Sequence, residues 1–162
     1  MAMMHHRLYV HIVWTTRNRA ALLDAARAEY LSEHLPIIAR QERARVLALG
    51  MVTTHIHLLV RLHPTTEIPQ LLQRMKGGTA YGMNAARPAA RPVLKWAKGY
   101  SITAVSPGGL ERVLAYVCAQ HLRHPTEAIV GWPRSEHATL TSSSLKRRLG
   151  GCRSPRHGEY VA

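Results

Sequence analysis

Two histidines separated by a single residue, His55 and His57, have the most definite chemistry in this sequence. They lie in the run MVTTHIHLLVRL, whose alternation predicts a β-strand with Ile56 and Leu58 on one face and both histidines on the other. Two neutral imidazoles held on a rigid strand can bind one divalent metal ion from the same side. A chain with eleven histidines also produces such a triplet by chance, so the spacing alone leaves open two packed or exposed histidines.

A tyrosine and a glutamine form the second chemical pair. The segment GLERVLAYVCAQHLRHP places apolar residues at helical spacing, which predicts an amphipathic helix over residues 109–123 that is stopped by Pro125. On another face of this helix Tyr116 and Gln120 lie one turn apart, and His124 follows Gln120 on the same face one turn later. A phenol and a carboxamide so arranged can offer a nucleophile with a metal ligand one turn away. A lone helical tyrosine can equally cover the edge of a core.

The remaining periodicities indicate the elements that position these residues. Strands are predicted at residues 7–15, 44–52, 55–62 and 100–105, and helices at 24–42, 67–86 and 109–123. The order βαββαβα predicts an α+β fold, a ferredoxin-like (RRM-like) sandwich whose antiparallel β-sheet is backed by helices on one face. Asp24 is the expected N-cap of the first helix, and Glu67 is expected to complement the positive end of the second. Gly77 and Gly78 are expected to interrupt that second helix.

The chain is expected to form a single domain over residues 1–149, with a short basic helix at 142–149 and a flexible basic tail at 150–162. Cys118 and Cys152 have neither the spacing of a zinc site nor the density of a secreted scaffold, which favours a reducing cytoplasm. No apolar run approaches the length of about eighteen residues that suggests a membrane span, and no signal peptide is recognisable. A membrane partner is therefore not expected.

The charge balance predicts a nucleic acid as the partner. Twenty-two Lys and Arg against nine Asp and Glu give a formal net charge of +13, a field that attracts polyanions before any specific contact forms. Basic residues recur beside the motif segments rather than in one tail, which favours a distributed track for phosphates. The candidate nucleic-acid-binding residues are Arg17, Arg19, Arg74, Lys76, Lys95, Lys98 and His124.

Taken in order along the chain, these motifs resemble a known family. The His-hydrophobe-His strand is followed by Trp96 and Tyr100 in LKWAKGYSITAVSP and then by Tyr116-x-x-x-Gln120. This series resembles the Y1 (HUH single-tyrosine) transposases of the IS200/IS605 type, including those associated with repetitive extragenic palindromic (REP) elements. RLYVHIVWTTRNR and LLQRMKGGTA extend the likeness, which spans roughly residues 7 to 133. Two departures are that Thr54 stands where many members carry Asp, and that the chain contains no Phe.

The resemblance implies a DNA transposase that cleaves and rejoins single-stranded DNA at hairpin-bearing element ends. Tyr116 would be the nucleophile and would form a 5′-phosphotyrosine intermediate. His55, His57 and Gln120 would hold Mg²⁺ or Mn²⁺. With one such tyrosine per site, the resemblance also implies a homodimer, in which the tyrosine helix can dock on the partner's histidines.

Two other functions remain open at the level of sequence. One is a domesticated protein that binds hairpin DNA with little or no turnover, although the four site residues argue against it. The other is an RNA-binding module, since the ferredoxin-like sheet is also the RRM scaffold. The aromatic pattern that stacks bases in RRM domains is missing here, and the absence of Phe weakens this alternative further.

Overall fold

The structure, a computed structural model, describes residues 6–133. The predicted basic helix at 142–149 and tail at 150–162 lie outside the described residues. The strands are β1 (Leu8–Thr15), β2 (Ala44–Val52), β3 (His55–Leu62) and β4 (Ser101–Val105). The helices are α1 (Ala25–Gln41), α2 (Ile68–Ala86), α3 (Leu110–Cys118) and α4 (Gln120–Arg123), with short 3-10 turns that include η3 (Pro125–Glu127). None of the helices in residues 6–133 has both the length and the apolar content that a membrane crossing requires.

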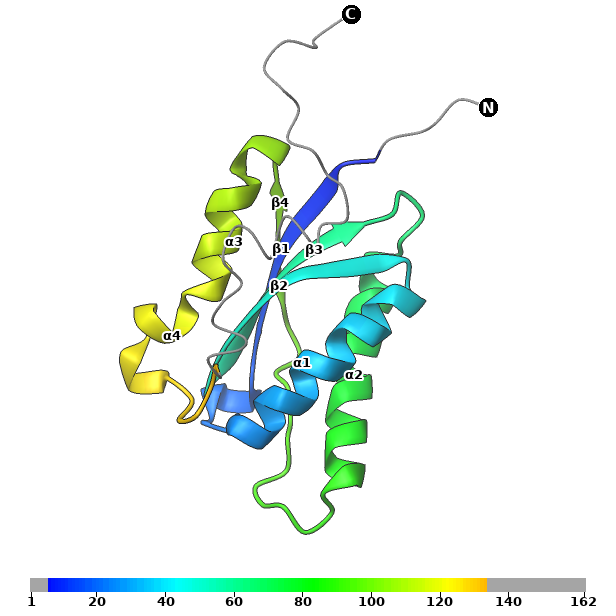
Figure 1. Ribbon diagram of the computed structural model, residues 1–162. Helices are drawn as coiled ribbons and strands as arrows, with labels where there is room; N and C mark the ends of the chain where they lie inside the picture. Colours follow the sequence, from blue (N-terminus) through cyan, green and yellow to red (C-terminus); the bar gives the residue numbers. More distant parts are fainter. Residues whose placement is uncertain (1–5, 134–162) are drawn as a thin grey trace, which may run out of the picture. The chain divides into compact units, whose positions relative to one another are not determined.

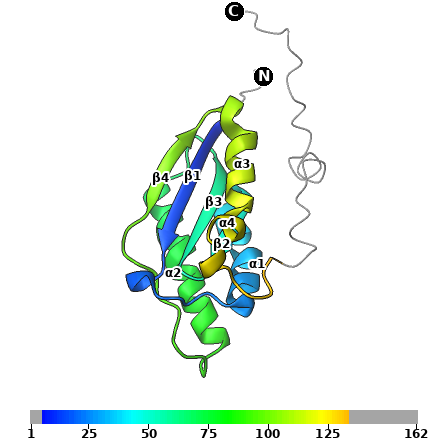
Figure 2. The same ribbon diagram turned by 90° about the vertical axis from the view of Figure 1, so that its left-hand side faces the viewer.

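The four strands form one sheet in the order β2-β3-β1-β4, and all neighbouring pairs are antiparallel. β4 forms the edge beside β1 (Figure 2). This order, with α1 joining β1 to β2 and α2 joining β3 to β4, confirms the predicted ferredoxin-like fold. The predicted strand bounds agree with the observed ones to within one residue, because the alternation of side chains defines each strand.

Helices α1 and α2 cover one face of the sheet (Figure 1). Their contact with the sheet follows from the sequence: Ala28, Leu31 and Leu35 recur at helical spacing on α1 and are fully buried. The predicted cap is confirmed, since the Asp24 Oδ1 atom accepts a hydrogen bond from the Arg27 backbone N–H at 2.8 Å. The buried residues from the strands on this side are Val10, Ile12, Trp14, Ala44, Met51, Ile56, Leu58, Val60 and Leu62.

Helix α2 runs without interruption through Gly77 and Gly78, so the expected break at these glycines is wrong. Each glycine costs about 1 kcal/mol in helix propensity, but Met75 and Thr79, which flank the pair on the buried face, are completely buried and hold the helix against the core. Glu67 is the N-cap residue of α2, although its side chain makes no capping hydrogen bond.

Helix α3 lies on the opposite face of the sheet, over β2 and β3 (Figure 1). The expectation that helices back only one face is therefore wrong for α3, which buries Leu114 and Val117 there. The continuous helix predicted at 109–123 is wrong as well. At Ala119 the backbone leaves helical geometry (φ −95°, ψ 15°), which ends α3 and starts the short α4. Spacing of apolar residues could not reveal the break, because the break changes the backbone dihedrals of one residue and leaves the apolar pattern unchanged.

Candidate active site

The two histidines of β3 lie on the sheet face that α3 covers. In the register of the sheet His57 pairs with Val13 on β1 and with Gly50 on β2, while His55 pairs with Thr15 and Val52. Both imidazoles are buried, and their ring centroids are 5.2 Å apart. The predicted arrangement of two imidazoles on one face of a strand is thus present in the structure.

Helix α3 brings Tyr116 to these histidines. The centroid of its ring is 5.7 Å from that of His57, with the rings edge to face. The guanidinium carbon of Arg123 lies 4.5 Å from the centre of the tyrosine ring, a cation–π contact that places a positive charge beside the phenol. Tyr116 therefore lies at the imidazole cluster and not at the edge of the helical core.

Gln120 is completely buried between α4 and the sheet. Its Nε2 atom donates to the Tyr116 carbonyl oxygen at 2.9 Å, whereas its Oε1 atom is buried and has no hydrogen-bond partner. A Cβ atom added to Gly50 would lie 2.9 Å from the Gln120 Cγ atom, and Gly50 pairs with His57. The Gln120 side chain, with its unpartnered amide oxygen, therefore lies over Gly50, the residue that pairs with His57.

These donors fit a divalent cation. Within residues 6–133 no group of three or more His, Cys, Asp or Glu side chains could hold a metal ion. Gln120 is the candidate for a third ligand beside the two histidines, because a buried acceptor with no partner costs about 1–3 kcal/mol and a cation would satisfy it. Two imidazoles and an amide oxygen would leave coordination positions open for phosphate oxygen and water.

His11 on β1 is a member of the cluster that the sequence analysis missed. Its Nε2 atom lies 2.9 Å from the His57 Nδ1 atom, and the two rings are stacked with centroids 5.1 Å apart. One proton lies between these nitrogens, so one imidazole donates and the other accepts. A signal was present, since His11 alternates with the buried Val10 and Ile12 and so lies on the face opposite to them.

Burial keeps the imidazoles neutral. It lowers the pKa of His57 to about 3, with the neighbouring His11, His55 and His124 contributing in the same direction. The pKa of His55 is lowered as well, chiefly by burial and then by His124, while Glu127 acts in the opposite direction. Neutral imidazole is the form that binds metal ions, and both histidines of β3 are in that form at pH 7.

A chain of polar contacts joins His55 to Thr54, in the turn between β2 and β3, and to Glu127 of η3. The Thr54 Oγ1 atom lies 2.9 Å from the His55 Nδ1 atom and donates to the Glu127 Oε1 atom at 2.8 Å. The other carboxylate oxygen, Oε2, lies 3.6 Å from the His124 Nδ1 atom, and the ring of His124 is 5.0 Å from that of His55. The structure thus brings the predicted residue His124 to the site, together with Glu127, which sequence reasoning did not identify.

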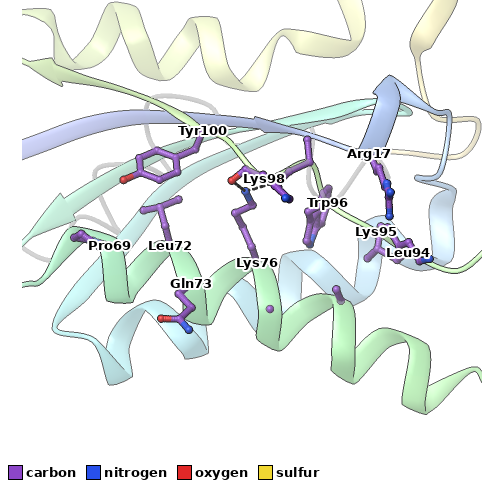
Figure 3. Close-up of a pocket in the computed structure, with 13 residues that line it drawn as sticks. Arg17, Pro69, Leu72, Gln73, Lys76, Leu94, Lys95, Trp96, Lys98 and Tyr100 are labelled. Atoms are coloured by element: carbon purple, nitrogen blue, oxygen red, sulfur yellow. Dashed lines mark hydrogen bonds between the residues drawn. The ribbon is translucent and has the colours of Figure 1, made fainter.

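Four of the predicted basic residues line a cavity of about 600 Å³ (Figure 3), namely Arg17, Lys76, Lys95 and Lys98. The cavity lies between α2 and the segment 94–100, whose backbone is joined to the end of β1 by a hydrogen bond from the Ala97 N–H to the Thr15 carbonyl oxygen at 2.9 Å. Its floor is largely apolar, and Tyr100 lies at one side of it. The cavity therefore combines an aromatic ring with positively charged side chains.

Lys76, Arg74 and Arg19 differ in the contacts that their side chains make within the protein. Lys76 donates to the carbonyl oxygens of Ala97, Lys98 and Gly99, so that all three hydrogens of its ammonium group are engaged within the protein. Arg74 forms an ion pair with Glu42 at 2.8 Å. Arg19 is exposed and near enough to His55 to lower the pKa of that imidazole.

Comparisons with known proteins agree with this geometry. The family model described as IS200-like transposase matches residues 4–120. The ISDra2 transposase TnpA of Deinococcus radiodurans is 28% identical over 120 residues, which cover 72% of this chain and 86% of that protein. A crystal structure from Deinococcus radiodurans R1, described as a candidate transposase, is 26% identical with a TM-score of 0.59 and covers 75% of this chain and 96% of that chain.

The fold is also shared with a REP-associated tyrosine transposase solved with a REP hairpin, which is 12% identical and has a TM-score of 0.58 over 76% of this chain and 74% of that chain. The family model covers well over half of the chain, and the matched residues include both histidines of β3, the tyrosine and the glutamine. The chain therefore belongs to the family of IS200-like transposases.

Proposed function

We propose that this transposase cleaves and rejoins single-stranded DNA through a covalent tyrosine intermediate at the site described above. The observation that carries the proposal is the position of Tyr116, 5.7 Å from His57 between ring centroids, beside a buried amide oxygen that has no partner. A nucleophile beside neutral side chains that can hold a metal ion is an arrangement that can carry out phosphoryl transfer.

In the proposed reaction the Tyr116 Oη atom attacks a phosphodiester phosphorus in line with the bond to the 3′ oxygen. The new bond joins the tyrosine oxygen to phosphorus, and the bond from phosphorus to the 3′ oxygen breaks. The 3′ oxygen leaves as a hydroxyl after taking a proton from solvent, and the phenolic proton passes to water. The 5′-phosphotyrosine retains the phosphodiester, so that a 3′ hydroxyl can attack it and rejoin the strands without an external energy source.

His55, His57 and Gln120 would hold Mg²⁺ or Mn²⁺, which when bound polarises the scissile phosphate and steadies the leaving oxygen. The protein's own groups supply the remainder. Burial holds both imidazoles neutral, and the ring contact with Arg123 fixes the phenol and adds positive charge where the phosphate arrives.

We propose that the DNA partner is single-stranded DNA that carries a hairpin. The support is the net charge of +13, the basic and aromatic cavity lined by Arg17, Lys95 and Lys98, and the shared fold with a REP-associated tyrosine transposase bound to a REP hairpin. Lys76 and Arg74 would act on DNA indirectly, by holding the segment 94–100 and the surface of α2 in place.

We further propose a homodimer, with about twice the 18.1 kDa mass of the chain. Each site holds one tyrosine at its imidazole cluster, whereas moving a DNA element requires strand breaks at two ends. A closed two-fold dimer is the commonest way to bring two such sites together.

The decisive experiment compares Tyr116→Phe with Tyr81→Phe, a control on an exposed tyrosine of α2. Each protein is incubated with Mn²⁺ and a single-stranded hairpin oligonucleotide and analysed on a denaturing gel. Wild type and Tyr81→Phe are expected to form a covalent adduct, while Tyr116→Phe binds the hairpin without forming one. An adduct that survives in Tyr116→Phe would refute the nucleophile, and hairpin binding by a wild type that never nicks would favour the domesticated binder.

A further inference from the structure

We propose that Glu127 and Thr54 are positioning residues for the transposase reaction. Together they form a carboxylate–hydroxyl relay, which holds the His55 imidazole so that its Nε2 atom is unprotonated and available as a metal ligand. The inference deepens the proposed function and rests on it, because it concerns the metal site of the same reaction. It assigns the orientation of His55 to a residue of η3 that lies far from it in the sequence.

The first step is the direction of the hydrogen bonds. The Thr54 hydroxyl carries one hydrogen, and an ionised carboxylate can only accept. The bond from Thr54 Oγ1 to Glu127 Oε1, at 2.8 Å, therefore uses the hydroxyl hydrogen. The second contact of the hydroxyl oxygen, 2.9 Å from His55 Nδ1, has to be one in which the oxygen accepts. His55 consequently carries its proton on Nδ1, and in the neutral ring this leaves Nε2 as the acceptor.

The second step is the way the relay is held in place. Thr54 is buried, and its carbonyl oxygen accepts a hydrogen bond from the Thr16 backbone N–H at 2.8 Å. The backbone carbonyl of Glu127 accepts from the Thr53 N–H at 2.8 Å, which fastens η3 to the turn between β2 and β3. The side chain of Glu127 is 28% exposed. Both ends of the relay are thus anchored by main-chain bonds that a side-chain substitution leaves intact.

The third step is the chemical effect. A metal-binding histidine commonly donates its other ring N–H to a carboxylate or to another acceptor, which fixes the tautomer and raises the basicity of the ligand nitrogen. Thr54 has no charge of its own, and its hydroxyl links the His55 imidazole to the carboxylate of Glu127. Loss of such a partner typically weakens metal binding by about 10- to 100-fold.

The tautomer is tested first, in metal-free protein, by nitrogen-15 NMR of the imidazole groups. Wild-type protein is expected to show His55 protonated on Nδ1 and bare on Nε2. Thr54→Val keeps the shape of the side chain and removes the hydroxyl, so the two tautomers of His55 are expected to become mixed. A wild-type His55 that carries its proton on Nε2 would overturn the relay.

The carboxylate is tested by calorimetry of Mn²⁺ binding without DNA. Thr54→Val and Glu127→Ala are each expected to weaken binding by about 10-fold or more. The double variant is expected to be no weaker than Thr54→Val alone, because the two residues act through one path. Glu111→Gln, which removes an exposed carboxylate on α3, is the control for the change in net charge and is expected to bind as the wild type does.

A rescue experiment separates the relay from a loss of packing. In the Glu127→Ala background, Thr54→Asp places a carboxylate directly beside His55 Nδ1, and it is expected to recover at least half of the lost free energy of Mn²⁺ binding. Normal Mn²⁺ affinity in Glu127→Ala, or losses that multiply in the double variant, would refute the relay. If wild type fails to bind Mn²⁺, the proposed metal-dependent function fails, whereas the tautomer of His55 still decides the relay.

Discussion

Gly50 is the position at which one added methyl group has the largest expected effect on the site. It lies on β2 opposite His57, directly beneath the end of α3. A Cβ atom at this position would lie 1.8 Å from the backbone carbonyl oxygen of Val117 and 2.9 Å from the Gln120 Cγ atom. The first contact is with backbone, so no side-chain rotation can relieve it.

The structure sets the size of the response to Gly50→Ala. Real Cβ atoms essentially never approach other heavy atoms closer than 3.0 Å, so the end of α3 has to retreat by roughly 1.2 Å, the difference between 3.0 and 1.8 Å. Overpacking of this kind costs about 1–3 kcal/mol, and a backbone contact favours the upper end of that range. Tyr116 precedes Val117 and moves with it, and a misplacement of about 1 Å can reduce a reaction rate about 100-fold.

The assay compares Gly50→Ala with Gly77→Ala. In the exposed interior of α2 a Cβ atom at Gly77 meets nothing within 4 Å, so that variant is expected to raise the free energy of unfolding by about 0.5–1 kcal/mol. Urea denaturation is expected to show Gly50→Ala about 3 kcal/mol less stable than wild type. The rate of covalent adduct formation with hairpin DNA is expected to fall about 100-fold in Gly50→Ala, whereas Gly77→Ala adds a methyl group to the cavity beside α2 and is the control for stability only.

Wild-type stability together with wild-type adduct formation in Gly50→Ala would refute the packing of α3 on β2. Reduced stability with normal Mn²⁺ binding and normal adduct formation would refute the narrower argument, that the close approach at Gly50 sets the position of the tyrosine and the glutamine above the histidines.

Two further predictions concern the polar groups of the site. Gln120→Leu removes one hydrogen bond but also the buried oxygen that has no partner. The metal-free variant is therefore expected to be about 1 kcal/mol more stable than wild type in urea denaturation, while its affinity for Mn²⁺ falls. A loss of stability in this variant would contradict this reasoning. His57 gains a proton in the unfolded chain below its ordinary pKa of 6.5 but in the folded protein only near pKa 3, so its contribution to stability is full above pH 6.5 and is lost as the pH falls toward about 3. Between pH 7 and pH 5, urea denaturation is expected to show a larger loss of stability for wild type than for His57→Gln, at up to about 1.4 kcal/mol per pH unit, and equal losses would contradict it.

The strands and the faces of the sheet were predictable from the sequence because both depend on a local period of two. Ile56 and Leu58 point toward α1 and α2, as the alternation predicted, and the histidines point away. The second helical layer could also have been predicted. Leu59 lies on the histidine face and is completely buried, and a strand that carries apolar residues on both faces is typical of a sheet covered on both sides.

The contacts between distant segments were not predictable in the same way. His11 reaches His57 because β1 pairs with β3 in one register, and the choice of neighbouring strand is not contained in either local pattern. Glu127 reaches Thr54 because η3 returns to the turn between β2 and β3. Nothing in the residues around either position signals that return, which depends on where α4 ends and on the break at Ala119.

The His57 imidazole and the Gln120 amide beneath α3 reduce the stability of the metal-free fold, and this cost is evidence about their function. A buried amide oxygen without a partner costs about 1–3 kcal/mol, and a buried imidazole whose pKa falls to about 3 opposes folding in acid. Apolar side chains on these positions of β3 and α4 would pack the same space without either cost. A purely structural role therefore predicts apolar residues at His57 and Gln120, whereas a ligand role predicts the neutral imidazole and the unpaired oxygen that the structure contains.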